Sequence, residues 1–61
     1  MTFTNEDKHA AIEREIKYRM RVYSRLVVEG KMTKEKSDRE LGVMSAILSD
    51  YHALVEKDRL L

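Results

Sequence analysis

A short break at residues 29–33 (EGKMT) divides this 61-residue chain into two long stretches, each with the periodicity of an amphipathic helix. Gly30 follows the first stretch directly, which indicates a helix end, because glycine adopts the left-handed conformation without steric cost. Thr33 is a typical N-cap, and Glu35 follows in the first turn, where the helix dipole favours an acid. The break therefore predicts a helical hairpin.

We expect a single domain over residues 1–61, with a first helix at about 5–29, a turn at 30–33 and a second helix at about 34–58. Thr4, with Asp7 three residues further on, is a start signal for the first helix. The connection is short, so the two helices should pack antiparallel. The predicted fold class is all-α, an antiparallel two-helix hairpin.

Composition narrows the class of protein further. Cysteine is absent, which excludes disulfides and thiolate zinc sites. Charged residues make up 38% and hydrophobic residues 43% of the chain, a balance typical of charged, helix-rich proteins rather than of disordered tails. No apolar run approaches the roughly 18 residues of a membrane span. We expect a cytoplasmic protein without a membrane segment.

Apolar residues recur at spacings of three and four in both predicted helices. The expected facing pairs across an antiparallel hairpin are Tyr23 with Leu41, Ile16 with Leu48 and Ile12 with Tyr51. Both apolar rows are wider than one hairpin can cover, and uncovered rows would leave the fold marginal. We therefore expect self-association into a helical bundle, most simply two hairpins in a four-helix bundle, or a higher oligomer.

Two groups of residues are candidates for the oligomer interface. A strip of small residues in the second helix would let another helix approach closely, and it consists of Gly42, Ser45, Ala46, Ser49 and Ala53. The surplus of the apolar rows consists of Met20, Val27, Ile47 and Leu54. The alternative for Gly42 is that it only marks a frayed or bent first turn.

Four cations and a tyrosine mark one face of the first helix. This basic face consists of Arg14, Lys17, Tyr18, Arg21 and Arg25. Such a face can bind an acidic protein surface or an anionic ligand, and cations beside an aromatic ring also occur at nucleic-acid sites. The alternative is a solvated face with i,i+4 pairs between Glu13 and Lys17 and between Glu15 and Arg19. The net charge of only +1 disfavours a general DNA binder.

Three further residues stand out without a clear role. Arg19 falls in the apolar sector, where a charge fixes register or oligomeric state, and Glu15 or Glu40 would be its partner if it is buried. An antiparallel hairpin brings His9 and His52 to the same end. Glu6-x-x-His9 has the spacing of di-iron bundles, but such sites need further inward carboxylates. We predict no metal site and no cofactor.

No pattern of nucleophilic catalysis is present. The serines lie on predicted helices, without a sharp turn or an adjacent His–Asp arrangement, and no glycine-rich phosphate loop occurs. A bare hairpin also lacks the concave, dry pocket that catalysis normally needs. We expect a protein that is not an enzyme.

The segments 19–27 (RMRVYSRLV), 30–33 (GKMT) and 39–41 (REL) together resemble short proteins encoded in phages and prophages. The resemblance covers about a third of the chain and implies a genomic setting more than an activity. Relatives often have proline where this chain has Ser24, so a kink is not implied here. Such proteins often occupy a host enzyme or defence complex, or hold a small ligand. The resemblance thus suggests a phage accessory or counter-defence factor in a bacterial host cell.

We interpret the chain as a non-enzymatic interaction protein whose basic face binds a host protein with an acidic surface or an anionic small ligand. A nucleic-acid-binding helical dimer that uses the same face is one alternative. A purely structural assembly module is another.

Overall fold

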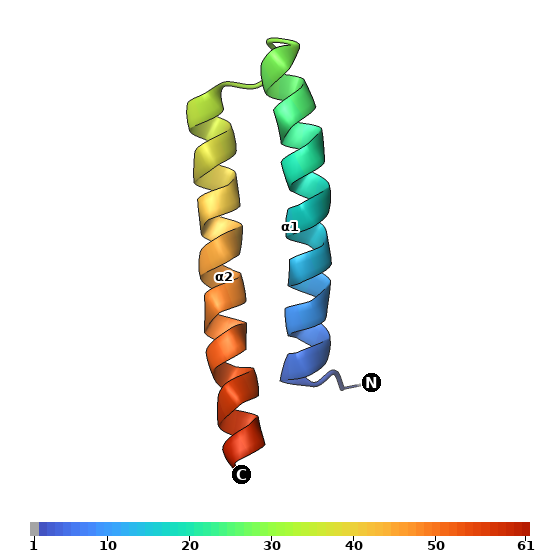
Figure 1. Ribbon diagram of the computed structural model, residues 1–61, viewed down its shortest axis with the longest axis vertical. Helices are drawn as coiled ribbons and strands as arrows, with labels where there is room; N and C mark the ends of the chain where they lie inside the picture. Colours follow the sequence, from blue (N-terminus) through green and yellow to red (C-terminus); the bar gives the residue numbers. More distant parts are fainter. Residues whose placement is uncertain (1) are drawn as a thin grey trace.

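The computed structural model describes residues 2–61 as two antiparallel helices that lie side by side, α1 (Asn5–Val28) and α2 (Lys34–Leu60) (Figure 1). The predicted all-α hairpin is confirmed. The first helix ends one residue before the predicted Glu29, which is its C-cap, and the second extends two residues beyond the predicted 58. Met1, the first residue of the predicted domain, lies outside the described residues.

The turn after α1 has the predicted glycine conformation. Gly30 has a φ of 74°, in the left-handed region. The backbone N–H of Lys31 donates to the carbonyl of Leu26 at 2.9 Å, and that of Gly30 donates to Val27 at 3.1 Å. This pair of hydrogen bonds is a Schellman motif, which satisfies carbonyls that the end of a helix otherwise leaves without partners. A Cβ atom at Gly30 would meet nothing within 4 Å, so the backbone conformation alone requires glycine.

Threonine caps the start of both helices, as predicted. The Thr4 hydroxyl accepts a hydrogen bond from the backbone N–H of Asp7 at 3.0 Å, and the Asp7 carboxylate accepts one from the backbone N–H of Thr4 at 3.1 Å. This is a complete capping box. Thr33 accepts from the backbone N–H of Lys36 at 3.1 Å. Each cap satisfies a donor in the first turn of its helix and so fixes where the helix begins.

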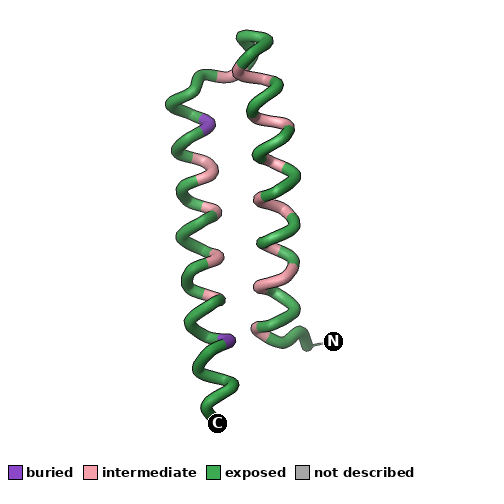
Figure 2. The backbone as a smooth tube through the Cα atoms, in the orientation of Figure 1, coloured by how far each residue is buried: buried purple, intermediate pink, exposed green. Residues whose placement is uncertain are grey.

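The interior of the hairpin is one row of side chains from each helix. Val55 and Ser37 are the buried residues of the described chain, and the rest of both rows is half-buried (Figure 2). We call the two rows together the hairpin seam, formed by Asn5, His9, Ile12, Ile16, Arg19, Tyr23 and Leu26 on α1 and by Ser37, Leu41, Met44, Leu48, Tyr51 and Val55 on α2. The spacing of three and four residues in both rows is that of a coiled coil.

The N-terminus and the C-terminus lie at the same end of the hairpin (Figure 1). The side-chain amide of Asn5 donates to the carboxylate of Asp58 at 3.1 Å. Ile12 lies seven residues after Asn5, and Tyr51 lies seven residues before Asp58. Both are half-buried. The hydrogen bond therefore agrees with the predicted facing of Ile12 and Tyr51.

The hairpin leaves an unusually large surface in water. Its radius of gyration is 14.2 Å, against about 10.5 Å for a compact chain of this length. It exposes 5068 Å², whereas a compact monomer of 7.2 kDa exposes about 4,100 Å². The excess, about 900 Å², reflects the elongated shape of the hairpin, whose extents are 47, 21 and 15 Å.

Candidate interaction surfaces

Arg19 lies in the hairpin seam, as predicted, and its partner is Glu15. The Nε of Arg19 donates to Oε1 of Glu15 at 2.8 Å. This hydrogen bond, together with the nearby Tyr23 hydroxyl, raises the pKa of Arg19. The charge is held at the edge of the seam by a residue one turn earlier on the same helix. Arg19 is therefore part of the hairpin structure.

The basic face, by contrast, lies on the outer side of α1. Its members are all exposed: Arg14, Lys17, Tyr18, Arg21 and Arg25. Among residues 2–61 four ion pairs are present, Glu15–Arg19, Glu29–Lys31, Lys34–Asp38 and Glu56–Arg59. None of them includes a cation of the basic face. The Glu13–Lys17 pair of the solvated-face interpretation is not among them either, whereas Glu15–Arg19 is. The four cations that the sequence pattern placed on one face therefore have no ion-pair partner in the described chain.

A shallow hollow lies on this face near its centre. It is lined by Tyr18, Arg21, Val22 and Arg25. Val22, half-buried, lies beside the exposed Tyr18 ring. Two guanidinium groups thus border a small apolar area, an arrangement that suits a carboxylate attached to an apolar stem.

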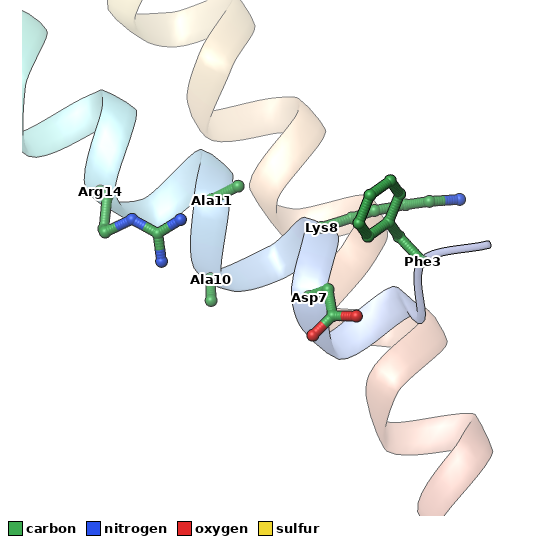
Figure 3. A pocket seen from close by; sticks show the side chains of 6 residues that line it. All are labelled: Phe3, Asp7, Lys8, Ala10, Ala11 and Arg14. Carbon is green, nitrogen blue, oxygen red and sulfur yellow. The ribbon is translucent and has the colours of Figure 1, made fainter. Parts of the chain in front are cut away.

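A second hollow continues the basic face toward the chain start, and sequence reasoning missed most of it. It is lined by Phe3, Asp7, Lys8, Ala10, Ala11 and Arg14. Figure 3 shows the two alanines between the Arg14 guanidinium on one side and the Phe3 ring and Lys8 on the other. Phe3 precedes the predicted first helix and was not among the predicted site residues. The Thr4 capping box holds the backbone directly after Phe3 against α1, so that box was the signal for an ordered aromatic here.

The α2 residues of the two candidate groups for the oligomer interface lie on two different sides of the seam. Helical spacing of about 100° per residue puts Ile47 and Leu54 on one side of α2 and Ser45 and Ser49 on the other. The second placement is borne out by a groove between the helices, lined by His9, Glu13, Ser45, Leu48, Ser49 and His52. The other members of the small strip, Gly42, Ala46 and Ala53, are exposed, as is Met20, and Val27 is half-buried. The nine residues therefore do not form one continuous surface.

The two histidines do meet across the helices, as predicted. Their ring centroids are 5.7 Å apart, with the planes tilted by 43°. Glu13 lines the same groove. Within residues 2–61, no group of three or more acidic, histidine or cysteine side chains is arranged to hold a metal ion.

Residues 2–61 form an all-α helical hairpin with a basic face on the outer side of α1. Comparison of the chain with protein-family models, with curated proteins and with solved structures found no match. Neither helix of the described chain has a stretch apolar enough to span a bilayer.

Proposed function

We propose that this protein is a non-enzymatic interaction protein whose basic face binds an acidic protein surface. The observation that carries the proposal is the gathering of four cations without an ion-pair partner on one exposed face of α1. Arg19, Lys34 and Arg59 each have a carboxylate within 4 Å on their own helix. The four cations of the basic face are exposed and have no such partner in the described chain. Their positive potential is available to an outside anion.

The two hollows favour a protein as that anion. A single exposed ion pair contributes only about 0.5 kcal/mol, so charges alone bind weakly. Apolar contacts are needed in addition, and both hollows supply them, one at Val22 beside Tyr18 and the other at Ala10 and Ala11 beside Phe3. An acidic amphipathic helix presents carboxylates and apolar side chains at the same spacing. An anionic small ligand would engage one hollow alone.

The wider setting is part of the same proposal. The resemblance to phage and prophage proteins makes a host protein in the bacterial cytoplasm the natural partner, and counter-defence or another accessory role the natural purpose. We also propose that the hairpin self-associates, because a single copy exposes about 900 Å² more than a compact monomer of its mass.

The test compares binding of labelled acidic amphipathic peptides to the wild type and to a variant with Arg14→Gln, Arg21→Gln and Arg25→Gln. We expect the dissociation constant to rise about tenfold, since three charge contacts of about 0.5 kcal/mol each are lost. A control with Lys31→Gln, Lys34→Gln and Lys36→Gln loses the same charge near the turn and should bind like the wild type. If the basic-face variant and the control variant both bind the peptides as tightly as the wild type, the basic face is only solvated.

Titrating the wild type with duplex and single-stranded DNA distinguishes the nucleic-acid alternative from our proposal. Phosphate contacts give a steep, linear loss of log affinity with log salt. Binding of the wild type to DNA but to none of the acidic peptides would contradict our proposal and support the alternative.

A further inference from the structure

Three apolar side chains remain exposed along one side of α2. Val43 is 48% exposed, Ile47 36% and Leu54 40%. They recur at intervals of four and seven residues, so they form a straight row, which we call the apolar stripe. Helical spacing places this stripe about a quarter turn away from the seam row that contains Val55. In a four-helix bundle each helix contacts two neighbours in directions about a quarter turn apart. The stripe therefore lies where a second hairpin would pack.

We propose that a second copy of this chain covers the apolar stripe, with α2 antiparallel to α2 of the second copy, around a two-fold axis that passes between Ile47 and Asp50. This inference rests on the self-association included in the proposed function, and it names the surface and the register.

The area supports a second copy as the occupant. One chain exposes 5068 Å², about 900 Å² more than a compact monomer of its mass. A standard interface buries about 800 Å² on each partner. A symmetric dimer would thus remove an area that matches the excess, using the same patch on both copies.

The charges beside the stripe favour the antiparallel register. Glu40 lies one heptad before Ile47, and Lys57 one heptad after Asp50. Neither takes part in the four ion pairs of residues 2–61. Around the proposed axis, Glu40 of one copy lies in the same layer as Lys57 of the other. In a parallel, in-register dimer, Glu40 would lie against Glu40 of the other copy and Lys57 against Lys57.

The same axis also pairs apolar with apolar. Val43 of one copy lies in the same layer as Leu54 of the other. The two-fold axis repeats this apolar layer at the other end of the stripe. Asp50 shares the central layer with Ile47, where its carboxylate reaches solvent at the edge. The central layer is therefore the weakest of the stripe.

The small strip on the other side of α2 is not the interface in this arrangement. Its serines and alanines offer little apolar area, and a Cβ atom at Gly42 would meet nothing within 4 Å. Helical spacing puts Arg14 and Arg21 on the side of α1 opposite the hairpin seam, so these cations stay exposed in this arrangement. A dimer would thus present two basic faces to partners.

The test measures molar mass by sedimentation equilibrium over a range of protein concentrations. The wild type should give twice 7.2 kDa. Ile47→Glu should raise the dimer dissociation constant about 100-fold or more, because it puts a charge at the centre of the interface. The control, Ala46→Glu, adds the same charge at the next residue and should leave the mass unchanged. Circular dichroism checks that both variants remain helical.

A charge swap tests the register without touching apolar residues. Glu40→Lys and Lys57→Glu should each weaken the dimer about tenfold, because each acts twice by symmetry. The double variant should recover the wild-type dissociation constant. Failure to recover it would overturn the antiparallel register.

Two other outcomes overturn the dimer or the apolar stripe as its interface. These are a wild type that stays monomeric at millimolar concentration, or a dimer that Ala46→Glu dissociates and Ile47→Glu does not. The binding proposal is judged separately, since a monomer that still binds acidic peptides contradicts only the dimer. A dimer that binds none of them contradicts only the basic face.

Discussion

The two glycines of this chain make a paired test of the hairpin, because alanine should act on them in opposite directions. Gly30 has a φ of 74° in the turn, and Gly42 lies inside α2. At both positions a new Cβ atom would meet nothing within 4 Å. The methyl group of alanine therefore makes no packing contact at either position. The change in the free energy of unfolding reports the effect of the backbone conformation alone.

For Gly30→Ala we expect a loss of about 1 kcal/mol in the free energy of unfolding. An L-residue in the left-handed region costs about 1–2 kcal/mol, and the reduced entropy of the unfolded chain returns about 0.4–1 kcal/mol of this. For Gly42→Ala we expect a gain of about 1 kcal/mol, the difference in helix propensity. In a chain this small, each effect shifts the melting temperature by about 4–8 °C.

The assay is thermal and urea unfolding followed by far-UV circular dichroism. All variants are compared at one protein concentration, because association makes the melting temperature depend on it. Gly30→Asn is a control for the turn and should lose less than Gly30→Ala, since asparagine tolerates the left-handed region better.

Two results would refute this reasoning. A neutral or stabilising Gly30→Ala would mean that the turn does not have a left-handed residue in solution. A destabilising Gly42→Ala would mean that another helix packs closely over Gly42. That second result would also move the interface from the apolar stripe to the small strip, against our inference.

Two further predictions concern the cap and the seam. Thr4→Ala should lower the free energy of unfolding by about 1 kcal/mol, because the N–H of Asp7 loses its acceptor; Thr2→Ala, outside the helix, should change nothing in the same urea titration, and equal effects would contradict the capping box. Val55→Ala should cost about 2 kcal/mol, since Val55 is 7% exposed and loses both packing and transfer free energy; Val28→Ala, at 87% exposed, should be close to neutral, and a neutral Val55→Ala would show that the seam is not packed there.

The fold was predictable from the sequence because its signals are local. The left-handed turn needs a glycine, and Gly30 is there. The caps need a short hydroxyl or acid directly before a helix, and Thr4 and Thr33 provide it. Each signal acts within five residues of the helix end it determines. The bounds of α1 and α2 accordingly differed from the prediction by only one or two residues.

The seam was predicted less well because the pattern counted only apolar residues. Ser37 is 7% exposed, as buried as Val55, yet its side chain gave no apolar signal. It lies at the end of the seam beside the turn, where the chain crosses from one helix to the other. Hydrophobic periodicity does not detect a buried residue that is polar.

The interaction surfaces could be predicted from the sequence only in part. The basic face follows from spacing on one helix, so its members were predictable. The oligomer residues span both sides of α2, a split that helical spacing already contains. The structure adds that Ser45 and Ser49 line a groove with His9 and His52. The identity of a partner depends on a second molecule, and no pattern within this chain contains it.

The position of the turn also decides how the hairpin opens and closes. The helices are joined covalently at Gly30, and both chain ends lie at the far end of the molecule (Figure 1). Closing a loop of few residues has a small entropy cost, so seam contacts beside the turn form first and break last. The Asn5–Asp58 hydrogen bond closes the longest loop of the fold and is among the first contacts to open. Protection of backbone amides from hydrogen exchange should therefore rise steadily from the chain ends toward the turn.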